Sequence, residues 1–158
     1  MVDWEHDYKE YPELTNTELN EIGFTSPHIQ ITEDFHAIVV KVHDGDTVTL
    51  NCDFRDFDFP LRQAFVDAPE LNTGEPGSAA KDWLEQEIEG EEVEIKIDRK
   101  NRVEKYGRLL GDIWFRGVSV GDTMIRLGLV SPFERRREGE IPVLDIIFNE
   151  QEWFSGAV

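Results

Sequence analysis

The sequence has very little cysteine, no long apolar run and too few bases to balance its acids. The only cysteine is Cys52, so an intramolecular disulfide and a cysteine-based zinc site are excluded, and a small strand side chain is its simplest role. No stretch reaches the roughly 20 apolar residues that cross a bilayer, and residues 1–7 lack the basic and apolar regions of a signal peptide. We therefore expect a soluble, cytoplasmic protein with no membrane partner.

The shortage of positive charge bears directly on the class of ligand. A net charge of -18 argues against simple nucleic-acid binding, because phosphate backbones usually meet positive surfaces. The charge is uneven, however: residues 1–35 hold nine acids and one base, whereas residues 96–108 hold six bases, two acids and one tyrosine. Either the acidic excess serves solubility or salt adaptation, or an acidic body keeps one basic face that attracts a polyanion.

The order of secondary structure predicts the fold. A chain of 158 residues with 39% hydrophobic content fits one domain with a sizeable core. An acidic N-terminal extension (1–35) contains a short helix over 15–22, where Thr15 and Glu18 form a capping box. The alternation of apolar residues then predicts strands over 36–42, 47–52, 61–66, 92–97 and 109–115, with helices over 78–88 and 120–127.

This pattern is mainly β with helices, of the α+β class. Five strands with a helix between the third and fourth, and a short helix after the fifth, match a small Greek-key barrel of the OB type, in which ligands lie across one face. The barrel domain spans residues 36–130. Residues 131–158 form a C-terminal segment packed on the domain, either as a covering helix from Pro142 or as an extended segment.

Acidic residues stand at two strand ends. Asp46 lies two and four residues before Val48 and Leu50. In a strand, its side chain therefore points to the same side as these two apolar residues. A carboxylate at the mouth of a core is costly unless it meets a cation or several donors. A ligand role and a local role, in which Asp46 accepts from N–H groups of its own turn, are equally compatible with this position.

Residues 61–70 form a largely apolar strand that ends in two carboxylates flanking Ala68 and Pro69. Arg62 lies near one end, and Asp67 and Glu70 lie at the other. Arg62 and Asp67 differ in parity, so a regular strand would point them in opposite directions. Both side chains can face one site only if the strand bends or bulges before Asp67.

Three motifs occur together in a fixed order: Asp-Gly-Asp-Thr-Val at 44–48, the run from Arg62 to Glu70, and Lys-Tyr-Gly-Arg at 105–108. In this order and on this strand pattern, the chain resembles the staphylococcal nuclease (thermonuclease) family over roughly residues 36–130. Each motif alone is weak, whereas their joint occurrence is specific.

The resemblance implies one Ca²⁺ held by the carboxylates of Asp46 and Asp67 and by the main-chain carbonyl of Ala68. Family members often carry threonine at the Ala68 position, but a main-chain ligand tolerates that change. The family's glutamate, which positions or deprotonates the attacking water, falls on Glu70. Hard oxygen ligands of this kind suit Ca²⁺.

The resemblance also implies a substrate-binding set. The two arginines that clamp the phosphate fall on Arg62 and Arg108, and the Lys-Tyr pair that contacts an adjoining phosphate falls on Lys105 and Tyr106. The base-stacking aromatics of the family have no clear counterpart, and Phe133 is the candidate. The basic stretch adds further phosphate contacts at Arg99, Lys100 and Arg102.

The resulting prediction is a monomeric, Ca²⁺-dependent nuclease that hydrolyses DNA and RNA at the 5′ P–O bond and leaves 3′-phosphate ends. One alternative is a non-catalytic OB module that binds nucleic acid or protein, although such modules usually lose the acids and arginines. Another is an acidic DNA mimic, which would have no basic face. An acidic nuclease without a leader also suits a phage or a salt-adapted microbe.

Overall fold

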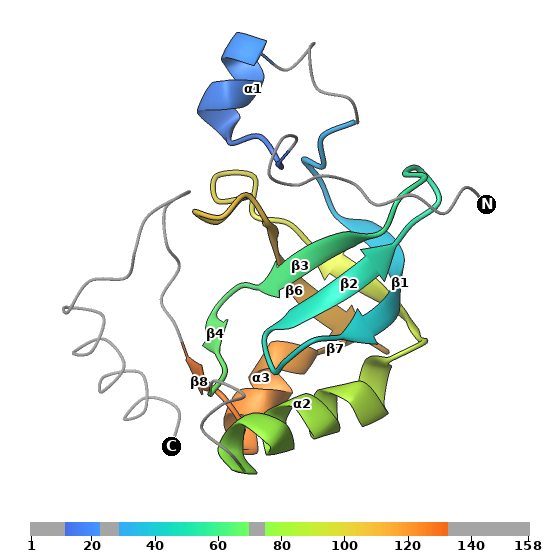
Figure 1. Cartoon of the computed structure of the whole chain (residues 1–158), viewed down its shortest axis with the longest axis vertical. Helices are drawn as coiled ribbons and strands as arrows, with labels where there is room; N and C mark the ends of the chain where they lie inside the picture. Colours follow the sequence, from blue (N-terminus) through green and yellow to red (C-terminus); the bar gives the residue numbers. More distant parts are fainter. Residues whose placement is uncertain (1–11, 23–28, 70–74, 133–158) are drawn as a thin grey trace, which may run out of the picture.

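The computed structural model describes residues 12–22, 29–69 and 75–132 and places a curled sheet at the centre of the molecule (Figure 1). Its strands run in the order β3-β2-β1-β5-β6-β7, and a parallel pairing of β3 with β6 closes the sheet on itself. The strand bounds are β1 Phe35–Val42, β2 Thr47–Asn51, β3 Phe59–Gln63, β5 Glu92–Lys96, β6 Leu109–Phe115 and β7 Val118–Ser119. The predicted five-stranded OB barrel is thereby confirmed.

Alternating apolar residues fill the barrel. Val39, Val48, Leu61, Ile95 and Ile113 are fully buried, and each lies on a different strand. β1 alternates buried and exposed residues until the register shifts between Val39 and Lys41. Because successive side chains of a strand point to opposite faces, this alternation leaves His36, Ile38 and Val40 on the outer face.

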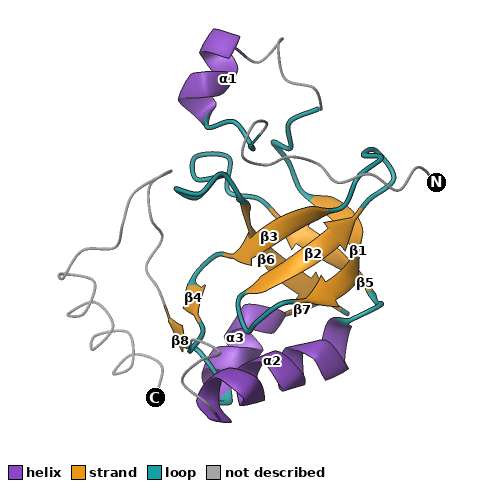
Figure 2. Ribbon diagram, in the orientation of Figure 1, coloured by secondary structure: helices purple, strands orange, loops and turns teal. Residues whose placement is uncertain are grey.

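Two helices cover one end of the barrel (Figure 2): α2 Glu75–Ile88 and α3 Val120–Arg126. α2 confirms the predicted helix and buries Ala80, Leu84 and Ile88 at helical spacing. It begins three residues before the predicted start, since Pro76 is tolerated in the first turn of a helix. α3 begins after Ser119, whose hydroxyl accepts from the N–H of Asp122 at 3.3 Å.

The third strand does not run to Val66 as predicted. β3 ends at Gln63, a turn follows, and the backbone of Phe65 takes a φ of +69° before β4 Val66–Asp67 begins. β4 leaves the barrel and pairs antiparallel with β8 Ser131–Pro132. The sequence predicted neither β4 nor β7 nor β8 as separate strands, because a two-residue strand is too short to show a period.

The segment before the barrel contains a capped helix and is anchored by a buried ion pair. α1 Asn16–Ile22 has the predicted capping box, in which Thr15 N–H donates to Glu18 Oε1 at 3.0 Å and Glu18 N–H donates to Thr15 Oγ1 at 3.3 Å. Just before it, Glu13 is buried and pairs with buried Arg55 at 2.7 Å. In the described part of the chain, no helix has the length and apolar character needed to cross a membrane.

Candidate functional site

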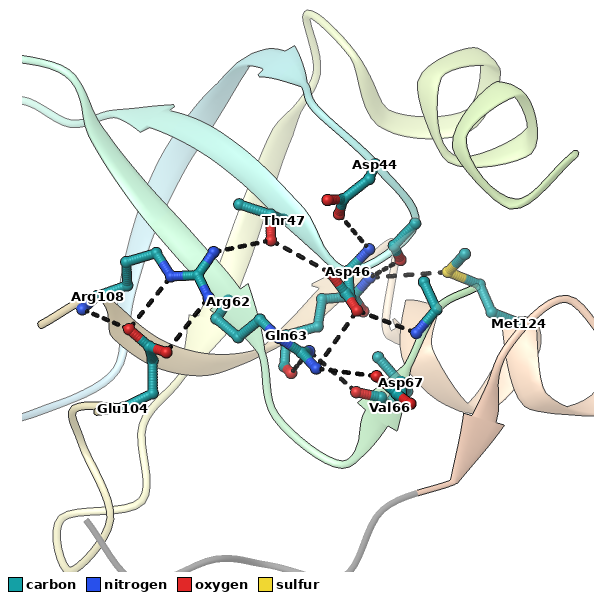
Figure 3. A network of polar contacts seen from close by, with 12 residues as sticks. Asp44, Asp46, Thr47, Arg62, Gln63, Val66, Asp67, Glu104, Arg108 and Met124 are labelled. Atoms are coloured by element: carbon teal, nitrogen blue, oxygen red, sulfur yellow. Dashed lines mark hydrogen bonds and ion pairs between the residues drawn. The ribbon is translucent and has the colours of Figure 1, made fainter. Parts of the chain in front are cut away.

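The three predicted motifs converge on the outside of the barrel (Figure 3). Asp46 lies in the turn before β2, Arg62 on β3 and Asp67 on β4. Arg62 Nη2 lies 3.3 Å from Asp46 Oδ2 and 3.6 Å from Asp67 Oδ1. Two carboxylates from separate segments therefore share one guanidinium nitrogen.

The bend at Phe65 removes the parity conflict between Arg62 and Asp67. It turns the chain so that Arg62 Nη1 donates to the carbonyls of Gln63 at 2.7 Å and of Val66 at 2.9 Å. The guanidinium thus spans the bend and holds its two ends together. The arginine that faces the site also stabilises the turn that brings Asp67 beside it.

Asp46 is a largely buried carboxylate held by donors from outside its own turn. Its Oδ2 accepts from Ala68 N–H at 2.9 Å and its Oδ1 from Thr47 Oγ1–H at 3.2 Å, while its own N–H donates to Asp44 Oδ1 at 3.0 Å. Burial, followed by the neighbouring Asp44, raises the pKa of Asp46 against the opposing effects of Arg62 and the Ala68 N–H. A carboxylate in this position is stabilised by any added positive charge.

Arg108 joins the same network from the end of the basic loop. Its Nε and Nη2 lie 3.2 Å from the two carboxylate oxygens of Glu104, and its Nη1 donates to Thr47 Oγ1 at 3.3 Å. Thr47 therefore links Arg108 to Asp46. The exposed ring of Tyr106 lies beside the guanidinium of Arg108 at 5.8 Å and the ammonium of Lys105 at 4.9 Å.

Close packing fixes the Asp-Gly-Asp turn against the rest of the site. A Cβ added to Gly45 would lie 2.7 Å from Ala68 Cβ and 2.8 Å from Ala80 Cβ, so only glycine fits there. The Gly45 carbonyl also accepts from Nε2 of buried Gln63 at 3.0 Å. These contacts set the position of Asp46 relative to Ala68, the two residues that the family resemblance assigns to one cation.

The donor set fits a hard cation. Asp46 and Asp67 supply carboxylate oxygens, and both carboxylates already lie beside Arg62 Nη2. Ala68, whose main-chain carbonyl is the other expected ligand, directly follows Asp67 in the chain. The side chain of Asp67 is 51% exposed, which leaves it room to turn toward a ligand. Over residues 12–22, 29–69 and 75–132, no three His, Cys, Asp or Glu side chains gather as a metal-binding group, so a cation here would need main-chain or substrate oxygens as well.

The residues predicted to bind substrate have different environments. Lys105, Arg99 and Lys100 are exposed, as a phosphate contact requires. Arg102 is 1% exposed and donates to the carbonyls of Ile31 at 2.7 Å and Leu14 at 3.0 Å. The prediction that Arg102 contacts phosphate is therefore wrong, because its guanidinium binds the main chain of the N-terminal segment. Glu70 and Phe133 lie outside the described residues.

Sequence reasoning missed three residues of the network: Thr47, Gln63 and Glu104. Thr47 and Gln63 looked like ordinary strand residues, and only the barrel brings them against Arg108 and Gly45. Glu104 carried a usable signal, since it stands four residues before Arg108 in a loop of otherwise basic character.

Comparison with known proteins identifies the family of the chain. Residues 60–147 match the family described as staphylococcal nuclease homologue. Proteins described as an uncharacterized endonuclease, from Escherichia coli O157:H7 and from Escherichia coli, are 31% identical over 118 residues, which are 74% of this chain and 72% of each relative. An uncharacterized protein of Bacillus anthracis is 25% identical over 95 residues, covering 57% of this chain and 44% of its own length. The chain belongs to the staphylococcal nuclease homologue family.

Proposed function

We propose that this protein is a Ca²⁺-dependent nuclease that hydrolyses phosphodiester bonds of DNA and RNA, cutting the 5′ P–O bond and leaving 3′-phosphates. The observation that carries the proposal is one network, in which Arg62 pairs with Asp46 and Asp67 and the Thr47 hydroxyl links Asp46 to Arg108. Family membership and the relatives described as endonucleases support the same class of reaction.

The two arginines supply the phosphate clamp. Arg62 donates to two main-chain carbonyls and pairs with Asp46 and Asp67, and Arg108 binds the Glu104 carboxylate and Thr47. Each guanidinium is therefore already oriented before substrate binds. Planar guanidinium donors match phosphoryl oxygens and bind more strongly as negative charge gathers on them. Loss of one preorganised donor of this kind typically lowers the rate by about 10²–10³.

Asp46, Asp67 and the Ala68 carbonyl would hold the calcium ion, which supplies polarisation of a phosphoryl oxygen when it is bound. The buried position of Asp46, with its raised pKa, makes that carboxylate the more dependent of the two on a nearby cation. Asp67 is the more exposed of the two proposed carboxylate ligands.

Glu70 is proposed to orient the attacking water and take its proton. The proposal for Glu70 comes from its place in the sequence, three residues after Asp67, and from the family resemblance. A general base of this kind typically contributes about 10²–10⁴ in rate.

The test is cleavage of single-stranded DNA and of RNA in Ca²⁺ and in a chelator. The parent should cut in Ca²⁺ and stop in chelator, and Glu70→Gln and Arg62→Ala should each lose at least about a hundredfold in rate. Arg126→Ala, an exposed arginine on α3, is the matched control and should keep full activity. Unchanged cleavage in chelator or in both site variants would overturn the mechanism, and no cleavage by the parent would favour the binding module.

A further inference from the structure

Residues 104–108 form a turn that carries three of the residues proposed to bind substrate, Lys105, Tyr106 and Arg108. Hydrogen bonds within the turn close it. Glu104 is buried, and its Oε1 accepts from the N–H groups of Tyr106 and Arg108, each at 3.0 Å. Gly107 N–H donates to the Glu104 carbonyl at 2.9 Å. These bonds set the shape of the 104–108 turn itself.

A second segment of the chain supports this turn from outside. Glu13 N–H donates to the Gly107 carbonyl at 3.0 Å. Pro12 lies so close that a Cβ added to Gly107 would come within 2.5 Å of Pro12 Cβ, and Gly107 has a φ of +82°, which also favours glycine. The turn therefore has glycine where the N-terminal segment rests on it.

The same segment also contacts the beginning of the basic stretch. Asn16 Nδ2 donates to the Arg99 carbonyl at 2.9 Å, and Asn16 Oδ1 accepts from Arg102 Nη1 at 3.2 Å. In Figure 1 these N-terminal residues lead into α1, beside the loop between β5 and β6. Residues 12–16 thus meet the basic stretch near both of its ends, at Arg99 and at Gly107.

The side chain of Glu13 fixes where this segment lies on the barrel. The side chains of Glu13 and Arg55 are each 1% exposed and are joined by hydrogen bonds of 2.7 and 3.0 Å. The Arg55 guanidinium also lies 4.5 Å from the ring centroid of Phe59, on β3. The desolvation of such a buried pair offsets most of its attraction, and its best-attested use is to fix register. The residue whose carboxylate is registered on the barrel is the one whose N–H binds Gly107.

We propose that Glu13 is a positioning residue for substrate binding. Paired with Arg55, it sets the N-terminal segment so that its own N–H and Pro12 hold the 104–108 turn in the form that presents its cationic and aromatic side chains to a polynucleotide. The inference rests on the proposed function and adds to the site a segment from outside the barrel. A turn without this support would have to be ordered by the substrate, which lowers affinity by about two- to tenfold for each side chain immobilised.

The test replaces the buried pair by apolar residues in the full chain, as Glu13→Leu with Arg55→Met. The urea midpoint should stay the same or rise, because such replacements are often neutral or stabilising. The affinity for a fluorescently labelled single-stranded oligonucleotide, measured in chelator, should nevertheless fall at least about threefold. Amide hydrogen exchange at positions 13 and 107 should accelerate relative to the barrel strands. Lys81→Met with Glu85→Leu removes an exposed pair of the same charges on α2 and should change none of the three readings.

A rescue experiment keeps the test decisive if the double variant loses stability. Gly107→Ala places a Cβ against Pro12 and should weaken binding of the oligonucleotide, and adding Pro12→Gly should restore part of the loss. Unchanged affinity and exchange in a folded double variant, or no restoration by Pro12→Gly, would overturn the positioning role, as would a parent that does not bind the strand. Binding by the parent without cleavage in Ca²⁺ would instead refute the proposed nuclease activity and leave the positioning role standing.

Discussion

Thr47 connects two parts of the candidate site by hydrogen bonds, the Asp46 carboxylate and the Arg108 guanidinium. It is buried, its hydroxyl donates to Asp46 at 3.2 Å, and it accepts from Arg108 at 3.3 Å. One hydroxyl therefore orients a proposed cation ligand and a proposed phosphate clamp at the same time. Small displacements of such groups cost far more in rate than in stability.

Replacing the Thr47 hydroxyl should separate its effect on the reaction rate from its effect on folding stability. We expect Thr47→Val, which keeps the shape but not the hydrogen bonds, to lower kcat for single-stranded DNA about tenfold or more. The net loss of folding free energy should stay near 1–3 kcal/mol, the typical effect of leaving buried partners unsatisfied. Steady-state kinetics and urea unfolding measure the two quantities. Thr47→Ser keeps the hydroxyl and should retain most of the activity, and equal losses in both variants would contradict the role of the hydroxyl.

The Asp112 carboxyl gives a prediction about how folding stability depends on pH. Burial raises the pKa of this carboxyl above its ordinary value of 3.8, against the hydrogen bonds from Trp114 and Ser119. Its contribution to stability is therefore full below pH 3.8 and is lost as the pH rises through the raised folded-state pKa.

The Asp112→Asn variant does not titrate, so it isolates that contribution. The free energy of unfolding of the parent, minus that of the variant, should fall as the pH rises across this window. Urea unfolding at constant ionic strength over a series of pH values measures the difference. A difference that stays constant or grows with pH would show that burial does not raise this pKa.

At the scale of elements, the N-terminal segment is fastened to the barrel by buried charged groups. The guanidinium of Arg102, from the basic stretch, donates to carbonyls on both sides of α1, those of Leu14 and Ile31. The Glu13 carboxylate pairs with Arg55 in the same buried layer. The basic stretch thus has two roles. Its exposed cations are available to a ligand, whereas Arg102 fastens the segment around α1 to the barrel.

Two arginine variants distinguish these roles. Arg102→Met should lower the free energy of unfolding by about 2–4 kcal/mol, since two buried carbonyls lose their donor. Arg99→Met changes an exposed side chain in the same loop and should alter it by less than about 0.5 kcal/mol. Urea unfolding of both variants is the measurement. Similar values for the two would mean that Arg102 does not anchor the segment.

At the scale of the whole molecule, a net charge of -18 coexists with a site that is proposed to bind a polyanion. Among the described residues, Arg99, Lys100 and Lys105 are exposed cations that all come from the basic stretch ending at Arg108. A small positive region on an acidic body attracts a strand to one place and repels it elsewhere.

Salt dependence tests whether these cations meet phosphates. For a single strand, each neutralised phosphate contributes about 0.7 to the slope of log affinity against log salt concentration. Arg99→Gln and Lys100→Gln should each flatten the slope by about that amount, with binding measured in chelator. Arg126→Gln removes the same charge on α3 and should leave the slope unchanged, so equal slopes for all variants would refute the contacts.

The sequence by itself determined most elements of the barrel and, through the family resemblance, named the charged residues of the candidate site. Alternation over five or more residues predicted β1, β2, β5 and β6, and the capping box predicted α1, because these signals are local. The three motifs likewise singled out Asp46, Arg62, Asp67 and Arg108, since each motif is contiguous in the chain.

Only the tertiary structure decided how those residues meet. Parity placed Arg62 and Asp67 on opposite faces, and a left-handed φ at Phe65, with Arg62 bonded across the turn, brings them together. The same reason separates Arg102 from Arg99: composition makes them alike, but packing buries one against main-chain carbonyls and leaves the other in solvent. Long-range contacts such as Thr47 with Arg108 depend on barrel closure, which no local pattern contains.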